Sequence, residues 1–165
     1  MSEVLCNVEF DDVLMAWALR DGKTIEEHRK SWQDLIDAMT TAGITGCVQV
    51  RVFPNDIPTM FVLGERPLQR FSARLLGDDS GYESARFARS LVDPVDGPFV
   101  AVGRTGAGPI TVLDGLHRMA AWVGHAETGR GYPLVVNVVL TERPVAGFEV
   151  LPALSPGPSR RRGMQ

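Results

Sequence analysis

The sequence has little that would cross-link it, hold a structural metal or carry it into a membrane. Its two cysteines, Cys6 and Cys47, are too few for a disulfide framework or a four-cysteine zinc site. Both lie in or beside apolar stretches, so we expect reduced thiols in the core. No apolar run approaches the ~18 residues of a membrane-spanning helix. The opening Met1-Ser2-Glu3 is acidic and unlike a secretory leader, so we expect a cytoplasmic protein with no membrane partner.

Lysine is scarce as well, and basic residues do not outnumber acidic ones. The formal net charge is −3 at pH 7, and broad nonspecific binding of nucleic acid normally needs a basic face. We therefore expect no nucleic-acid partner. Of the 17 basic residues only Lys23 and Lys30 are lysines. Arginine is the better bidentate ligand for phosphate, but a GC-rich genome gives the same preference. Only arginines near a candidate site therefore carry functional weight.

Apolar residues recur with both helical and strand periods, which indicates an α/β (mixed α+β) fold with a small mixed β-sheet flanked by helices. With 165 residues and 44% hydrophobic content, the chain suits one domain. We expect that domain over residues 1–151 and a disordered basic tail over 152–165, which is rich in proline and arginine. The expected strands cover residues 4–10, 47–53, 59–63, 99–103, 109–113 and 134–140. The expected helices cover residues 11–19, 24–42, 67–76 and 82–92, with another after residue 114.

Several of these elements carry local signals. Asp11 is expected to cap the first helix, and Thr24 with Glu27 forms a capping box that opens the second. The stretch Gly103–Gly108 is rich in glycine but lacks the lysine of a phosphate-binding P-loop, so it predicts a hairpin turn.

Basic residues at helical spacing are open to two interpretations. Arg66, Arg70 and Arg74 are four apart and share a helix face; they form either a clamp for a substrate anion or a solvated face, and we favour the solvated face. His28 falls on an apolar stripe and is expected to pack there. His125, eight residues after His117, is expected to play no part in a site.

The most informative segment is Pro109–Trp122, which passes from a β-rich stretch through a polar break into a helix-forming run. The break contains Asp114, His117 and Arg118. Gly115 lets the backbone turn sharply and approach a ligand. A helix that starts here has free first-turn N–H groups and a partial positive charge beside Arg118, which together suit a phosphate or carboxylate. A bland alternative is that Asp114 only caps this helix while Arg118 pairs with a surface carboxylate.

This segment, VLDGLHRMAA, resembles the DGxHR-type box of the ParB/sulfiredoxin-like superfamily, and the resemblance extends over residues 98–141. That superfamily includes the partition protein ParB, sulfiredoxin and small kinases that phosphorylate free serine. The resemblance implies a ParB/sulfiredoxin-like core that binds nucleotide phosphates. Sulfiredoxin has its cysteine where this chain has Leu116, which argues against reduction of cysteine sulfinate. Only 25 residues follow Leu140, which argues against the DNA-binding domain of ParB proper.

With sulfinate reduction and partition binding set aside, the resemblance implies a nucleotide-dependent phosphotransferase that acts on a small hydroxylated metabolite. It implies a nucleoside tri- or diphosphate (ATP, ADP or CTP) bound by Gly115, Leu116, His117 and Arg118. It also implies Asp114 and His117 as catalytic residues, with Mg²⁺ held by Asp114 and the nucleotide phosphates. Two alternatives stay open: a nucleotide-binding regulator without catalysis, and a ParB-like nuclease. A homodimer is possible under each.

The general base is expected from another part of the chain. In the serine-kinase branch an early glutamate takes the proton of the substrate hydroxyl, and Glu26 and Glu27 are the residues that match its position. Glu27 already belongs to the capping box, so Glu26 is the candidate. Asp56 and Glu65 come next if Glu26 lies too far from Asp114. On these roles, replacing Arg118 with alanine is expected to weaken phosphate binding while the melting temperature changes little.

Overall fold

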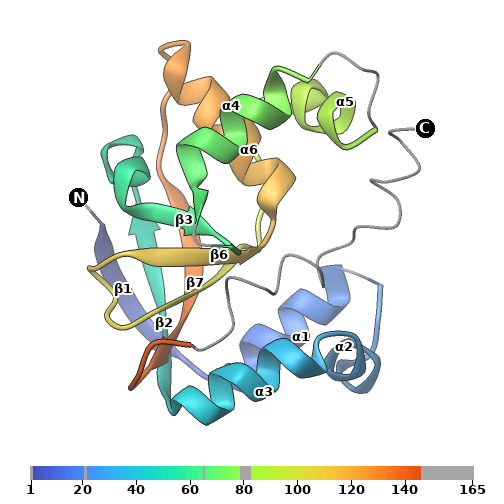
Figure 1. Ribbon diagram of the computed structural model, residues 1–165, viewed down its shortest axis with the longest axis vertical. Coiled ribbons are helices and arrows are strands. Elements are labelled where there is room, and N and C mark those ends of the chain that lie inside the picture. Colours follow the sequence, from blue (N-terminus) through green and yellow to red (C-terminus); the bar gives the residue numbers. More distant parts are fainter. Residues whose placement is uncertain (1, 21, 65, 79–82, 146–165) are drawn as a thin grey trace.

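The computed structural model describes residues 2–20, 22–64, 66–78 and 83–145. Its centre is a seven-stranded mixed sheet with helices on both faces (Figure 1), which confirms the predicted α/β class. The strands are β1 (Glu3–Val8), β2 (Ile44–Val52), β3 (Met60–Val62), β4 (Arg66–Pro67), β5 (Val100–Gly103), β6 (Ile110–Asp114) and β7 (Leu134–Thr141). The helices are α1 (Phe10–Arg20), α2 (Ile25–Ser31), α3 (Gln33–Ala42), α4 (Leu68–Leu76), α5 (Glu83–Ser90) and α6 (Leu116–Glu127), with a 3-10 turn η1 (Pro54–Thr59).

The order of the strands is β1-β2-β7-β5-β6-β3-β4. β7 and β5 run parallel, β6 and β3 run parallel, and β5 and β6 are antiparallel. The middle of the sheet is therefore two parallel pairs that point in opposite directions. The carboxyl ends of β6 and β3 meet at one end of the sheet, and those of β5 and β7 meet at the other. Ligands of open α/β sheets favour such carboxyl ends, and this sheet offers two.

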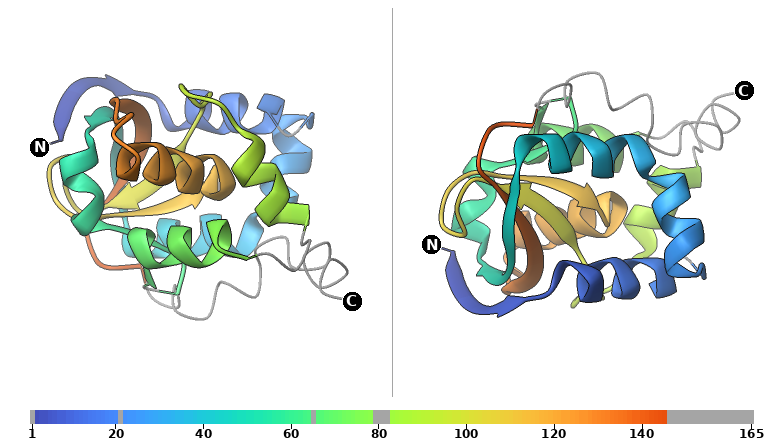
Figure 2. Two further views of the ribbon diagram at one scale, coloured as in Figure 1. Left: turned by 90° about the horizontal axis from the view of Figure 1, so that it is seen from above. Right: turned by 90° about the horizontal axis from the view of Figure 1, so that it is seen from below.

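Each face of the sheet packs against its own group of helices. Figure 2 shows α4, α5 and α6 over one face in its left view and α1, α2 and α3 over the other in its right view. Side chains alternate along β6 because successive residues of a strand point to opposite faces. Val112 packs in the core that contains Trp122 of α6, and Leu113 packs in the core that contains Trp17 of α1. The ladder of β5 and β6 shifts register between Val100 and Ala101, so this alternation does not extend to Asp114, whose carboxylate lies beside Arg118 of α6.

The single helix predicted over residues 24–42 is wrong. The structure has two helices, α2 and α3, that meet at Trp32. The backbone of Trp32 has φ −114° and ψ 23° and leaves the helical conformation, while its ring lies 5.1 Å from the ring of Trp17. Offset aromatic contacts of this kind are favourable at 4.5–7 Å. The break between α2 and α3 therefore coincides with a contact between Trp32 and Trp17, fifteen residues upstream in α1. The apolar periodicity of residues 24–42 does not reveal this contact.

The start of α1 also differs from the prediction. The helix begins at Phe10, so Asp11 lies in its first turn and is not the cap. Its carboxylate pairs with Arg29 of α2 at 2.9 Å, which ties the first two helices together. In the part of the chain that the structure describes, no helix is long and apolar enough to cross a membrane. The expected tail, residues 152–165, and the domain boundary at residue 151 lie outside the described residues.

The two cysteines have different environments, and the expectation that both are buried is wrong for one of them. Cys6 is exposed on the edge strand β1, whereas Cys47 is buried in β2. Burial raises the pKa of the Cys47 thiol to about 11, and the negative charge of Glu9 adds to this effect. The thiolate is the reactive form, so about one Cys47 in a thousand is ionised at pH 8.

We therefore expect a thiol reagent such as dithiobis(nitrobenzoate) to modify one cysteine in the native protein at pH 8 and both in denaturant. Cys6→Ser should abolish the native reaction, and Cys47→Ser should leave it unchanged. Rapid modification of both thiols in the native protein would contradict the burial of Cys47.

Candidate functional site

The predicted site forms at the carboxyl end of β6, where Gly115 connects the strand to α6. Gly115 is the N-cap of α6 and has φ +87°, a conformation that L side chains rarely adopt. A Cβ atom here would lie 2.6 Å from Cδ1 of Phe99 and 3.2 Å from Nη2 of Arg118. The sharp turn expected at Gly115 is thus confirmed. The close approach that it permits is to Phe99 and Arg118, within the protein itself.

Asp114 is not the N-cap of α6, and no side chain caps this helix with a hydrogen bond. It is the last residue of β6 and pairs across the ladder with Val100 of β5. Its side chain is 18% exposed, and Oδ2 lies 3.5 Å from Nη2 of Arg118. The pairing of Val62 with Val112 places the carboxyl end of β3 beside this residue. The ends of both strands therefore flank the same turn.

Arg118 has partners within the protein fold. It is 8% exposed, and its Nη1 donates to the carbonyl oxygens of Asp96 at 2.6 Å and Pro98 at 3.0 Å. Its guanidinium also lies over the ring of Phe99, 4.9 Å from the centroid. With Asp114 on its other nitrogen, Arg118 joins the segment before β5 to the first turn of α6. The guanidinium already contacts the Asp96 and Pro98 carbonyls and the Asp114 carboxylate. A direct contact between Arg118 and a ligand phosphate therefore stays a prediction.

His117 lies on the first turn of α6 and faces α5. Its ring meets the ring of Phe87 edge to face, with centroids 6.2 Å apart and planes at 85°. His117 is half-buried, whereas Phe87 is 48% exposed. The structure therefore gathers Asp114, Gly115 and Arg118 in direct contact around one turn, with Leu116 and His117 following them on the helix.

Glu26 belongs to the other helical layer. It lies on α2, over the opposite face of the sheet from α6, and its side chain is exposed. Glu26 forms no hydrogen bond or ion pair with any residue that the structure describes. Its role as general base stays a prediction. Asp56 is in η1, where its Oδ2 accepts the backbone N–H of Phe53 at 2.8 Å, and Glu65 lies outside the described residues.

The capping box at the start of α2 is confirmed. The backbone N–H of Thr24 donates to Oε1 of Glu27 at 2.9 Å, and the N–H of Glu27 donates to the hydroxyl of Thr24 at 3.1 Å. The hydrogen bond from the Thr24 backbone, and then the bond with its side chain, lower the pKa of Glu27 below its usual 4.5. Glu27 is therefore bound to its own helix.

This pKa shift predicts a pH dependence. The folded-state pKa of Glu27 is lowered. Its contribution to the stability of the folded protein is therefore fully present above pH 4.5 and is lost as the pH falls through the folded-state pKa. We expect Glu27→Gln to lower the melting temperature at pH 7, with a difference from the unmodified protein that shrinks in circular dichroism melts as the pH is lowered below 4.5. Glu26→Gln in the same turn is the matched control. An equal loss in both variants would show that the cap contributes nothing specific.

The other charged and glycine-rich segments have simpler roles. Of the predicted arginine face, Arg70 and Arg74 are exposed on α4, whereas Arg66 lies on β4 with its guanidinium 5.4 Å from the ring centroid of Phe71. The loop Gly103–Gly108 joins β5 to β6, which confirms the predicted hairpin. A Cβ at Gly106 would lie 2.5 Å from Val4, so this glycine permits packing on β1.

His125 is the residue near the site that sequence reasoning missed. It is buried, and its Nε2 lies 3.1 Å from the carbonyl oxygen of Leu91. A carbonyl only accepts, so Nε2 carries the proton and Nδ1 accepts from the hydroxyl of Tyr132 at 2.8 Å. The same hydroxyl accepts the backbone N–H of Val95 at 3.1 Å. This network holds the segment that leads to Asp96. Leu91 and Val95 lie more than 25 residues before these two side chains, so the sequence contains no signal for the network.

No group of three or more metal-ligating side chains occurs among the described residues. Comparison of the chain with known proteins found no matching family model, no matching curated protein and no matching solved structure.

Proposed function

We propose that this protein binds the phosphates of a nucleotide at the first turn of α6 and transfers one phosphoryl group to a small hydroxylated metabolite. The observation that carries the proposal is the glycine turn from the carboxyl end of β6 into α6, with a partly exposed carboxylate before it and a half-buried imidazole after it. The N-terminus of a twelve-residue helix supplies about half a positive charge and outward N–H groups, which favour a phosphate.

Each residue of the box has a role under this proposal. His117 and the first-turn N–H groups stabilise the charge on the transferring phosphoryl group. Arg118 fixes the shape of the turn through Asp96 and Pro98, and its charge lies behind the phosphate site. Asp114 orients the acceptor hydroxyl or supplies one oxygen ligand to Mg²⁺. One protein carboxylate is sufficient for this ion, because Mg²⁺ in nucleotide sites takes its other ligands from phosphates and water.

The reaction exchanges one bond to phosphorus for another. The acceptor hydroxyl oxygen forms a bond to the terminal phosphorus, and the bond from that phosphorus to the bridging oxygen breaks. The nucleotide leaves with one phosphate fewer. The hydroxyl proton passes to a carboxylate base, for which Glu26 is the candidate. Because Glu26 lies on α2, this assignment requires α2 to approach the box when substrate is bound.

Phosphorus NMR tests the proposal directly. The protein is incubated with ATP, ADP or CTP, Mg²⁺ and a panel of hydroxylated metabolites, and we expect a new phosphomonoester resonance with matching loss of the terminal phosphate. No new resonance with any pair, under conditions where nucleotide binding is saturated, would overturn the transferase.

The base assignment has a separate test. Glu26→Gln should lose turnover and keep its nucleotide affinity, whereas Asp34→Asn, an exposed carboxylate in the first turn of α3, should keep both. Full turnover by Glu26→Gln would remove Glu26 as the base.

One observation favours a second candidate, a nucleotide-binding regulator without catalysis. Phe87 is 48% exposed directly beside His117, and an aromatic side chain at the rim of a ligand site suits a partner protein. If the protein is such a regulator, the phosphorus NMR experiment would show that the nucleotide binds and is not cleaved. Phe87→Ser would then weaken partner binding without changing nucleotide affinity.

A further inference from the structure

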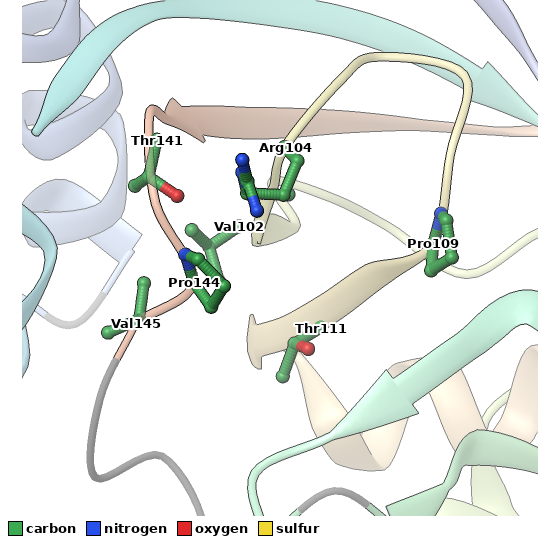
Figure 3. Close-up of a pocket in the computed structure, with 8 residues that line it drawn as sticks. Val102, Arg104, Pro109, Thr111, Thr141, Pro144 and Val145 are labelled. Atoms are coloured by element: carbon green, nitrogen blue, oxygen red, sulfur yellow. The ribbon is translucent and has the colours of Figure 1, made fainter. Parts of the chain in front are cut away.

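A second candidate site lies at the other end of the sheet. A pocket of about 180 Å³ opens beside the carboxyl ends of the parallel strands β5 and β7 (Figure 3). Residues of three neighbouring strands and of the segment after β7 line it: Val102, Gly103, Arg104, Pro109, Thr111, Thr141, Pro144 and Val145. The placement follows from the topology, since β5 and β7 end where β6 begins.

This pocket is separate from the box at α6. Pro109 and Thr111 lie at the amino end of β6, and Asp114 lies at its carboxyl end. A strand rises about 3.3 Å per residue, which puts Thr111 about 10 Å and Pro109 about 16 Å from Asp114. A single phosphoryl group cannot contact both places. The pocket is therefore not the acceptor subsite of the proposed transferase.

The lining combines one cation, hydroxyl groups and apolar walls. Arg104 is exposed and forms no hydrogen bond or ion pair with any residue that the structure describes. Figure 3 shows its guanidinium turned back along the pocket toward Thr141 and Pro144. The hydroxyl of Thr141 donates to the carbonyl of Arg143 at 2.8 Å, so its oxygen can still accept. The hydroxyl of Thr111 projects from β6 at the same pocket.

Size and charge together define the ligand class. Pockets for drug-sized ligands occupy about 300–1,000 Å³, so a space of about 180 Å³ is too small to enclose a nucleotide and suits a molecule of a few carbons. A guanidinium pairs bidentately with either a carboxylate or a phosphate, but one cation neutralises the single charge of a carboxylate and only half the charge of a phosphate dianion. We propose that this pocket binds a small monocarboxylate whose short alkyl chain lies against Val102, Pro109 and Pro144.

An amide NMR titration with butyrate tests this proposal. We expect saturable shifts at the backbone amides of Gly103, Thr111 and Thr141, and binding at least tenfold weaker for butyramide, which has the same shape and no charge. Inorganic phosphate should also bind at least tenfold more weakly than butyrate. Equal binding of butyramide, or shifts located elsewhere, would overturn the proposal.

Two arginine variants complete the design. Arg104→Gln should weaken butyrate binding at least tenfold, because the charge-assisted pair is lost. Arg74→Gln removes another exposed arginine, on α4, and should leave the affinity unchanged. Equal affinities in the two variants would contradict a role for Arg104. These butyrate affinities do not depend on phosphoryl transfer. The test of this pocket is therefore independent of the test of the proposed function.

Discussion

Gly115→Ala is expected to destabilise the protein by about 2–5 kcal/mol. Of this loss, about 1–2 kcal/mol comes from forcing an L residue into the left-handed conformation. A further 1–3 kcal/mol comes from overpacking, because the new Cβ would lie 2.6 Å from the buried ring of Phe99. Phe99 is 1% exposed and packs within the hydrophobic core. Urea denaturation measures the loss as a shift of the midpoint at constant slope.

Gly129→Ala is the matched control for this prediction. Gly129 follows the opposite end of α6 with φ +80°, and a Cβ there would meet nothing within 4 Å. The free energy of unfolding of Gly129→Ala should fall only by the conformational cost of about 1–2 kcal/mol. Both substitutions restrict the unfolded chain equally, so the difference between them measures the contact with Phe99. Equal losses of stability in Gly115→Ala and Gly129→Ala would mean that the ring of Phe99 moves aside and that the turn at Gly115 tolerates a side chain.

Arg118→Met is expected to destabilise the protein by about 3–5 kcal/mol, the usual result of removing one partner from a buried ion pair. The substitution keeps most of the side-chain volume but leaves the carbonyls of Asp96 and Pro98 without their donor. It also leaves the Asp114 carboxylate, 18% exposed, without the nearby cation. The sequence alone predicted a small change in melting temperature for a substitution at Arg118. The structure reverses that expectation, because the guanidinium is buried.

Two further variants separate charge from packing. Arg74→Met, on the exposed side of α4, should change the stability by no more than about 0.5 kcal/mol. Adding Asp114→Asn to Arg118→Met should recover part of the loss, because it removes the uncompensated charge; the double-mutant cycle isolates this coupling. A loss below about 1 kcal/mol for Arg118→Met would indicate that Arg118 is free to serve a ligand.

The sequence by itself determined the features that depend on neighbouring residues. The hairpin of β5 and β6, the capping box of Thr24 and Glu27, and the sharp turn at Gly115 all follow from turn stereochemistry and short hydrogen bonds. The α/β class follows from two apolar periods along one chain. These signals are local, so they can be read without knowing which strand lies beside which.

Only the tertiary structure decided the features that depend on partners distant in the chain. The break at Trp32 accompanies a contact with Trp17, and the partners of Arg118 come from a segment about twenty residues upstream. The order of the strands produced two parallel pairs of opposite direction, and with them two ends where a ligand could bind. Periodicity fixes which face of an element is apolar, but it does not specify the neighbour that covers that face. The position of a buried cation or a pocket is therefore set by the sheet order.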